Sequence, residues 1–404
     1  MRNIFYFLFL FIIYLITIYF FSSGELKGDE ELYITFAQNL SQGFFSPIDK
    51  INLPIGPGYS ILISCFILLS IPLAVVKYLN AFFLFFSVIY FYKTLGFYCT
   101  KRTSIIFSIL LGFYLPFFTK IIFITPEIFS LFLISGFLYH YIKNYKENKN
   151  SIHLIIASLY SGFLIITEII FGYIFLILLV LYIVLFFLKK NIVLKKNIYI
   201  ILFALLISSP YFLYSYSITG NFFYLSTSFG SKLYWLSSPY DEEYGDWHHS
   251  NHFNLYPELK ENHYDFWMSL RKYNYVDRDE ILFTKAFENI YSHPVKFFSN
   301  WIANLGRLFF SYPYSYNTQK LTTLFFLIPN FALILLSIII FFIQKRLRLS
   351  FPKELNLTLH LGFLFLFIKS FFGGNVSDFF LLTVVLLMFI AIQYPKIRII
   401  SKTA

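Results

Sequence analysis

Apolar residues dominate the chain in long runs that short polar stretches interrupt. About ten of these runs are close to the roughly 20 apolar residues that a helix needs to cross a bilayer. The pattern therefore predicts an all-α polytopic membrane protein with about ten transmembrane helices, external juxtamembrane helices and one larger external loop region. The ten runs cover residues 4–21, 78–95, 104–118, 128–142, 152–167, 169–188, 198–214, 321–343, 355–371 and 379–394.

Two apolar runs near the start of the chain need a separate interpretation. No small-residue cleavage site follows the run 4–21, so we expect it to be a retained first span and not a signal peptide. The run 58–71 lies between Pro57 and Pro72, and counting it as a full span would reverse the side on which later basic loops fall. We therefore expect a hairpin or juxtamembrane helix that enters and leaves on the outer face.

Charged residues are distributed unevenly between the two sides of the predicted membrane. The net charge is +11, and Lys and Arg collect in short loops beside the spans, where Glu147 and Glu354 are the only acids. By the positive-inside rule these loops and both termini are cytoplasmic, and the other carboxylates are external. This distribution predicts a lipid bilayer and not nucleic acid as the partner. We expect a multi-pass protein of the plasma (inner) membrane, with its site on the external or periplasmic side where the acidic loops fall.

The chain divides into three regions. Residues 1–214 form an N-terminal transmembrane module with acidic external loops, residues 215–320 form the external region, and residues 321–404 contain the last spans and a cytoplasmic tail. In the external region, residues 279–291 and the stretch beginning at Pro294 have helical apolar spacing, and we expect both helices to pack on the membrane face.

Acidic residues mark three predicted external loops. Asp29 and Glu30 follow the first span and begin an amphipathic stretch that Gly43 ends, Glu127 follows Pro126, and Glu168 lies between two spans. Helix capping and the helix dipole alone could explain acids at helix starts. An ionisable group at the membrane edge, however, usually faces a cavity or a partner, which makes functional use the working hypothesis.

Aromatic and polar residues occur together in the predicted external stretch 240–249. Most Tyr and Trp side chains near a membrane belong to its interfacial belt. Rings beside hydrogen-bonding groups also suit carbohydrate, and here Tyr240, Trp247 and His248 are the candidates. Two adjacent histidines rarely converge on one ion, so His248 and His249 do not predict a metal site.

Short motifs occur in an order that resembles the GT-C class of membrane glycosyltransferases, which includes the protein O-mannosyltransferases and the aminoarabinose transferase of lipid A. The resemblance covers roughly residues 5 to 310. It implies a polyprenyl-phosphate sugar as donor and a catalytic base in the first acidic pair. The motifs are Gly28-Asp29-Glu30-Glu31-Leu32-Tyr33, Pro57-Gly58-Tyr59, Thr125-Pro126-Glu127 and, later, Ala286, Ile290, His293, Pro294 and Arg307.

We therefore expect an inverting transfer of one sugar to an acceptor hydroxyl on a glycolipid, glycan or protein. Asp29 is the expected base, and Arg307 is the first choice for the donor phosphate because guanidinium can bind phosphate with two hydrogen bonds. A snorkelling Arg at the membrane edge is the plainer account of Arg307. The full set of expected site residues is Asp29, Glu30 and Glu127 for catalysis, Arg307, Lys232 and Arg271 for phosphate, and Tyr33, Tyr59, Tyr240, Trp247 and His248 for substrate.

Two alternatives remain open from the sequence. A transporter or flippase of lipid-linked saccharide would also need acidic and aromatic groups, although such proteins usually contain repeated halves, and none is apparent here. A non-catalytic family member is the other alternative, because Tyr214-Ser215 stands where many relatives have Arg-Asn, and Glu168 where they often have a basic residue. No cofactor is predicted. A divalent metal is compatible with the class, but the sequence offers no convincing ligand set.

Overall fold

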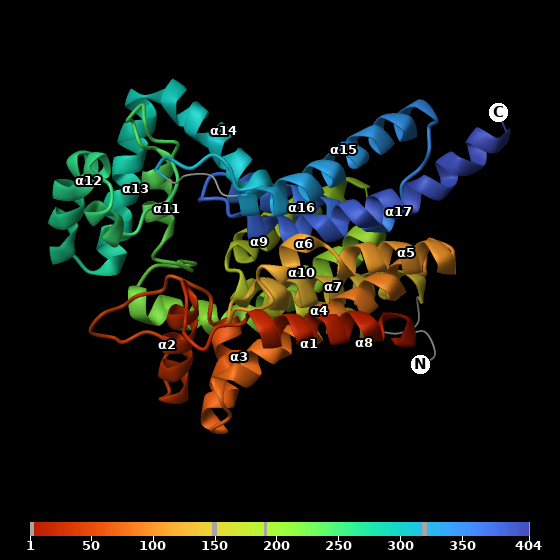
Figure 1. Cartoon of the computed structure of the whole chain (residues 1–404), viewed down its shortest axis with the longest axis horizontal. Coiled ribbons are helices and arrows are strands. Elements are labelled where there is room, and N and C mark those ends of the chain that lie inside the picture. Colours follow the sequence, from red (N-terminus) through yellow and green to blue (C-terminus); the bar gives the residue numbers. More distant parts are fainter. Residues whose placement is uncertain (1–3, 148–151, 190–191, 317–320, 404) are drawn as a thin grey trace.

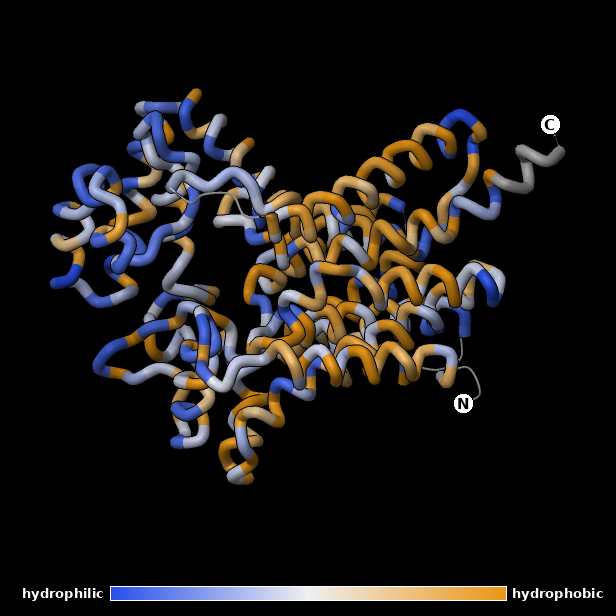
Figure 2. Tube along the Cα trace, viewed as in Figure 1, coloured by the Kyte–Doolittle hydropathy of each residue, from blue (hydrophilic) through white to orange (hydrophobic). Residues whose placement is uncertain are grey.

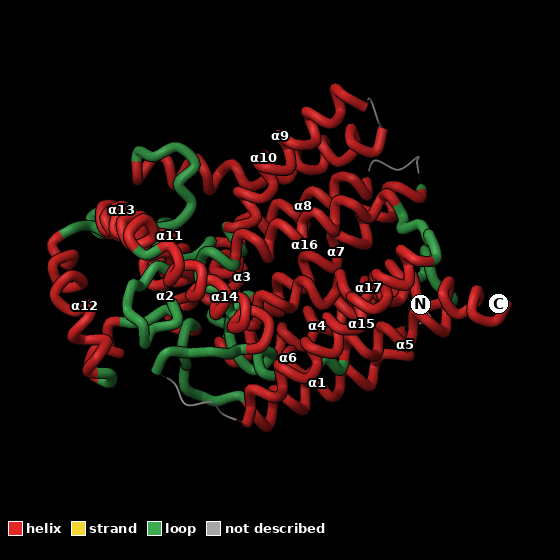
Figure 3. The backbone as a smooth tube through the Cα atoms, turned by 90° about the horizontal axis from the view of Figure 1, so that it is seen from above, coloured by secondary structure: helices red, strands yellow, loops and turns green. Residues whose placement is uncertain are grey.

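Helices supply the regular structure of the computed structural model, which describes residues 4–147, 152–189, 192–316 and 321–403. Among these residues there is no strand, as Figure 3 shows, and the predicted all-α class is confirmed. In chain order the elements are η1 Ile4–Phe7, α1 Leu8–Phe21, α2 Glu30–Ser41, α3 Pro57–Leu68, α4 Leu73–Leu95, α5 Lys101–Gly112, α6 Leu115–Phe118, α7 Glu127–Lys146, α8 Ile152–Thr167, α9 Ile170–Lys189, α10 Ile192–Thr219, α11 Phe229–Leu236, η2 Ser250–Asn254, α12 Pro257–Ser269, η3 Leu270–Lys272, α13 Tyr275–Ser292, α14 Pro294–Phe310, η4 Leu321–Thr323, α15 Leu324–Arg346, η5 Lys353–Leu355, α16 Asn356–Lys369, η6 Val376–Asp378 and α17 Phe379–Thr403.

Within the described ranges, five helices are long and apolar enough to cross a membrane. They are α4, α9, α10, α15 together with η4, and α17 together with η6. The chain is therefore a helical membrane protein. Of the other expected spans, α7 has 20 residues but is less apolar, and the rest are shorter or interrupted. In the run 104–118, α5 ends at Gly112 and α6 begins at Leu115, next to Pro116, which favours the first turn of a new helix.

The apolar helices lie side by side in a bundle, and a more polar group of helices, α11 to α14, covers one end of it (Figures 1 and 2). Element η1 and the end of α17 lie at the opposite end.

Small residues allow close packing inside the bundle. Gly136 of α7 faces the ring of Tyr160 of α8 so closely that an added Cβ would lie 2.6 Å from it. On the other side of α8, Ser208 of α10 donates a hydrogen bond to the carbonyl of Gly162 at 3.0 Å. Small side chains and interhelical hydrogen bonds are the usual means of helix association where lipid removes the hydrophobic driving force.

Helices α2 and α3 form a pair at the same end of the bundle as α11 to α14 (Figure 1). At 12 residues, or about 18 Å, α3 is too short to cross a membrane, as the sequence predicted. Its start fits closely against the last residue of α8, because a Cβ on Gly58 would lie 2.4 Å from Thr167 Oγ1 and 2.8 Å from Thr167 N. The motif that contains Gly58 therefore joins this pair to the turn that carries Glu168.

The external region has its own apolar core, in which α11 packs against α13. An added Cβ on Gly230 would lie 1.9 Å from the carbonyl oxygen of Asp279, and Gly230 N donates to Asp279 Oδ1 at 2.7 Å. Helix α13 begins at Tyr275, earlier than the expected residue 279, because Asn274 accepts a capping hydrogen bond from Asp277 N. Helix α14 begins at Pro294, as predicted.

Candidate functional site

The first acidic pair stands at the start of α2, where its two members have different surroundings. Asp29 is exposed, and its side chain makes no capping hydrogen bond. Glu30 is fully buried, and its carboxylate accepts hydrogen bonds from Lys27 N and Ile124 N, each at 2.8 Å. Lys77 Nζ lies 3.3 Å from the same carboxylate. Glu30 thus joins three segments of the chain, whereas the carboxylate of Asp29 is accessible to a substrate.

Glu127, the first residue of α7, pairs with Lys120 from the preceding turn. Lys120 Nζ donates to Glu127 Oε1 at 2.7 Å. The second oxygen, Oε2, is buried and has no hydrogen-bond partner within the described part of the chain. An unsatisfied buried carboxylate oxygen calls for a partner, which a water molecule or a substrate hydroxyl could supply.

Glu168 lies in the turn between α8 and α9 and belongs to a second group of charges. Ser130 Oγ donates to Glu168 Oε1 at 3.4 Å, and Lys369 Nζ lies 3.9 Å from Oε2. Lys369 is closer to Asp378, at 2.9 Å. Burial raises the pKa of Glu168 to about 7; Lys369 opposes this rise, and Asp378 and Glu127 add to it. A carboxyl group that titrates near neutral pH is suited to proton transfer.

Lys232 of α11 approaches these charges from the external region. Its ammonium makes no ion pair within 4.0 Å with any described carboxylate. Burial and the charge of Lys369 lower the pKa of Lys232 to about 8, against the opposing effect of Asp378 and Glu168. The lysine is therefore a cation in this group without an anion of its own.

Tyr33 lies within electrostatic reach of acids from the three predicted external loops. Burial raises the pKa of Tyr33, and the charges of Glu168, Glu127 and Asp29 raise it further. The Tyr33 ring meets Tyr59 edge-on, with 5.5 Å between ring centroids. Tyr59 itself is fully buried and its hydroxyl has no described hydrogen-bond partner. We name Asp29, Lys120, Glu127, Glu168, Lys232, Lys369 and Asp378 the charged cluster.

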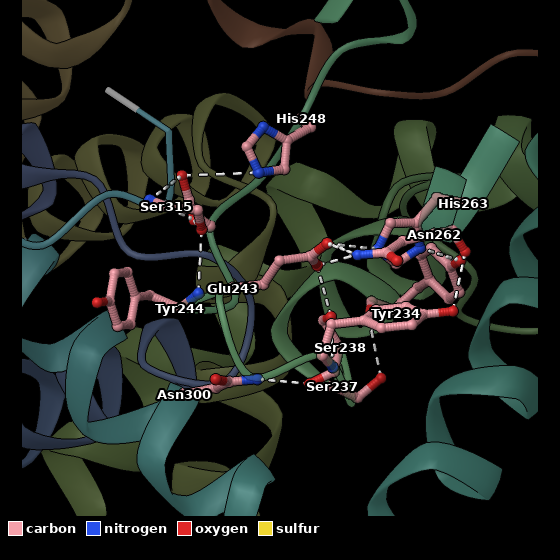
Figure 4. A network of polar contacts seen from close by, with 12 residues as sticks. Tyr234, Ser237, Ser238, Glu243, Tyr244, His248, Asn262, His263, Asn300 and Ser315 are labelled. Carbon is pink, nitrogen blue, oxygen red and sulfur yellow. Dashed lines mark hydrogen bonds and ion pairs between the residues drawn. The ribbon is translucent and has the colours of Figure 1, made fainter. Parts of the chain in front are cut away.

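A separate polar network stabilises the external region (Figure 4). Glu243 accepts hydrogen bonds from Ser238 Oγ at 2.5 Å and Asn262 Nδ2 at 3.0 Å, and His263 Nε2 lies 2.9 Å from its carboxylate. On the other side of the His263 ring, Nδ1 lies 2.6 Å from the hydroxyl of Tyr234. Burial alone would raise the pKa of Glu243, but these partners lower it to about 2. Because the network is buried and satisfied, it positions the loop 237–246.

The three substrate candidates of the external region have different exposure. Tyr240 and Trp247 are exposed, and Tyr240 also donates a hydrogen bond to the carbonyl of Asn262 at 3.0 Å. His248 is buried against the ring of Trp235, 3.7 Å from Asp246. The structure thus leaves Tyr240 and Trp247 accessible to a substrate and places His248 in the interior.

Two predicted phosphate ligands lie outside the charged cluster. Arg307 is buried, and its guanidinium donates to the carbonyls of Tyr244 at 2.9 Å and Pro313 at 3.0 Å and to Asn304 Oδ1 at 3.3 Å. These partners give Arg307 a structural role in joining α14 to the loops around it. Arg271 is exposed on η3, away from the bundle.

Three members of the charged cluster were not anticipated from the sequence. Lys120 lies before the predicted acidic helix start, and Lys369 and Asp378 flank the external turn between the last two apolar runs. The sequence signal that could have found Lys369 and Asp378 is the presence of a lysine and a carboxylate at the ends of two predicted spans. Ionisable groups at that depth in a membrane are costly.

Comparison with known proteins does not assign a function to this site. No protein-family model matches the chain, and no curated protein matches its sequence significantly. Its function therefore has to follow from the residues and their positions.

Proposed function

We propose that the chain is a membrane glycosyltransferase that moves a sugar from a polyprenyl-phosphate donor to an acceptor hydroxyl, with inversion at the anomeric carbon. The observation that supports this proposal most directly is the charged cluster at the end of an apolar bundle. It combines an accessible carboxylate, a carboxyl group with a pKa near 7 and a cation without an anion. Transfer of a sugar from a phosphate needs a base and a cation of these kinds.

In the proposed reaction, the acceptor oxygen attacks the anomeric carbon while the bond from that carbon to the phosphate oxygen breaks. The electron pair of the broken bond stays on the departing phosphate. Asp29 takes the proton of the acceptor hydroxyl, since an alcohol is a poor nucleophile until a positioned base accepts its proton. The buried anchors of Glu30 hold the start of α2, so Glu30 is a positioning residue in this scheme.

The departing phosphate gains negative charge, and Lys232 is the cation that would bind it. Lys120 and Lys369 lie 2.7 and 2.9 Å from Glu127 and Asp378, and each is already neutralised. The unpartnered oxygen of Glu127 would accept a hydrogen bond from the acceptor and orient it. Glu168 would change its protonation in response to the charge beside it.

The topology forms part of the proposal. We infer about ten membrane crossings with both ends of the chain cytoplasmic, the charged cluster at the external face and the plasma membrane as the location. Single cysteines placed at Glu147 and Asn251, in a variant without Cys65 and Cys99, should react with an impermeant maleimide from opposite sides of the membrane. Labelling of both cysteines from one side would overturn this topology.

The activity is tested with purified protein in lipid nanodiscs, radiolabelled polyprenyl-phosphate sugars and an extract of cell-envelope acceptors. Asp29→Asn should lower turnover by roughly 10²- to 10⁴-fold while donor binding survives, because the amide cannot accept the proton. Glu31→Gln is the matched control, since Glu31 is also exposed in the first turn of α2 and loses the same charge.

Unchanged turnover in Asp29→Asn would remove Asp29 from the mechanism. Absence of transfer with every donor, together with movement of labelled lipid between the leaflets of proteoliposomes, would favour the transporter or flippase. Absence of both activities would favour a non-catalytic protein.

A further inference from the structure

Helix α14 is amphipathic in the reverse of the usual sense. A surface helix normally turns its apolar face to the protein and its polar face to water. In α14 the polar residues Asn300, Asn304 and Arg307 are buried, whereas Val295, Phe298 and Ile302 are exposed. The buried face forms hydrogen bonds with neighbouring loops: for example, Asn300 Nδ2 donates to the carbonyls of Leu236 and Ser238 at 3.0 and 2.9 Å (Figure 4).

The exposed apolar face continues onto the preceding helix. On α13, Phe283 and Phe287 are exposed one turn apart, with 4.9 Å between their ring centroids, and Tyr291 is 90% exposed. We name Phe283, Phe287, Tyr291, Val295, Phe298 and Ile302 the apolar ridge. Large apolar side chains gathered on one surface usually mark an interaction site.

Aromatic contacts connect the ridge to the apolar surface of the bundle. The rings of Phe298 and Trp301 contact each other, with 5.7 Å between their centroids. The Trp301 ring stacks on Phe371 with 5.5 Å between centroids, and Phe371 contacts Phe367 of α16 with 5.2 Å between centroids. Phe367 and Phe363 are exposed on α16, an apolar helix of the bundle. Asn304 Nδ2 also donates to the carbonyl of Ser370 at 2.6 Å, which fixes α14 at the end of α16. The ridge therefore begins at the level where the bundle ends.

We propose that the apolar ridge inserts into the lipid leaflet at this end of the bundle, so that α13 and α14 hold the external region against the bilayer. An interfacial helix buries its apolar face at the boundary of head groups and acyl chains. Three observations agree with that position. The apolar face is exposed, it continues onto the apolar surface of α16, and the opposite side of α14 makes polar contacts with the protein. The proposal does not depend on the glycosyltransferase assignment.

The test measures lipid and water contact separately in the full-length protein. In a variant without Cys65 and Cys99, single cysteines replace Phe287 or Phe298 and carry a polarity-sensitive nitrobenzoxadiazole label. The proteoliposomes contain phosphatidylcholine with or without a shallow doxyl-labelled phosphatidylcholine, and iodide is the aqueous quencher. Val180→Cys on α9 is the lipid control, and Glu261→Cys on α12 is the water control, since both positions are exposed.

The labels at Phe287 and Phe298 should be quenched by doxyl lipid, as at Val180, and should resist iodide, which quenches the label at Glu261. Iodide quenching equal to that at Glu261 would place the ridge in water and overturn the proposal. Resistance to both quenchers would show that protein, such as a second copy of the chain, covers the ridge, which would also overturn it. Both replaced side chains are exposed, so these variants are expected to fold.

Discussion

Lys77 of α4 and Glu30 of α2 form a buried ion pair in which Lys77 Nζ lies 3.3 Å from Glu30 Oε1. Lys77 Nζ also donates to the carbonyl of Ser23 at 2.9 Å, and Glu30 accepts from Ile124 N. The pair thus connects α2 to α4, one of the apolar helices long enough to cross a membrane, and to the loop before α7. Because Glu30 directly follows Asp29, the buried ion pair holds the exposed Asp29 carboxylate at a fixed place, whereas the Glu30 carboxylate itself is inaccessible.

Removal of one partner from this pair should destabilise the protein strongly. Lys77→Met leaves the Glu30 carboxylate buried without its cation, and such a loss costs about 3–5 kcal/mol. The double variant Lys77→Met with Glu30→Gln should recover part of that loss, because it buries no unpaired charge. Thermal unfolding in detergent measures both effects. Equal melting temperatures for wild type and Lys77→Met would show that the pair contributes no stability.

Glu168 should make stability depend on pH. Its pKa is raised to about 7 by burial, so the native state binds a proton more tightly than the unfolded chain does, with its pKa of 4.5. The stability that this proton supplies is present at low pH and declines as the pH rises toward 7. Glu168→Gln cannot lose a proton, so its melting temperature relative to wild type should increase from pH 5 to pH 7 and then level off. A constant difference across that range would contradict the raised pKa.

The close approach of α3 to the end of α8 predicts the effect of a single methyl group. Gly58→Ala would place its Cβ 2.4 Å from Thr167 Oγ1 and 2.8 Å from Thr167 N, and overpacking of this kind costs about 1–3 kcal/mol. Gly24→Ala is the control, because an added Cβ there has no neighbour within 4 Å. Gly58→Ala should lower the melting temperature and Gly24→Ala should not. Equal melting temperatures for the two variants would mean that α2 and α3 can shift away from α8 at no cost.

The sequence located the acids of the site better than it located their partners. Asp29, Glu127 and Glu168 were recognisable because each interrupts an apolar pattern near the end of a predicted span. Lys369 and Asp378 were missed because only tertiary packing brings the turn between α16 and α17 to Glu168, more than 200 residues away in the chain. Periodicity cannot report such a contact.

Arg307 shows a second limit of sequence patterns. The helical spacing correctly predicted an amphipathic α14, but it could not tell which face the protein would bury. The ordinary rule assigns the apolar face to the interior. Here carbonyl groups of neighbouring loops take up the polar face, so Arg307 turns inward and the predicted phosphate ligand becomes a structural residue.

The pH dependence of donor binding distinguishes two roles for Lys232, binding of the donor phosphate and packing of its side chain. Its pKa is lowered to about 8, first by burial and next by Lys369, so the side chain loses its charge as the pH rises through that value. If the ammonium binds the donor phosphate, the KM for the polyprenyl-phosphate sugar should rise above pH 8 in wild type. Lys232→Arg keeps its charge there, because the pKa of guanidinium exceeds 12, and should flatten this pH dependence.

Lys232→Gln should raise the KM for the donor below pH 8, where the wild-type lysine is charged, and the difference from wild type should shrink above that pH. The change in the KM for the acceptor should be smaller. Lys260→Gln is the matched control, since Lys260 is an exposed cation on α12 in the same external region. A donor KM that is independent of pH in wild type and unaffected in Lys232→Gln would exclude Lys232 as the phosphate ligand. An equal loss in Lys232→Arg and Lys232→Gln, accompanied by a lower melting temperature in both, would instead assign the lysine to packing between α11 and the bundle.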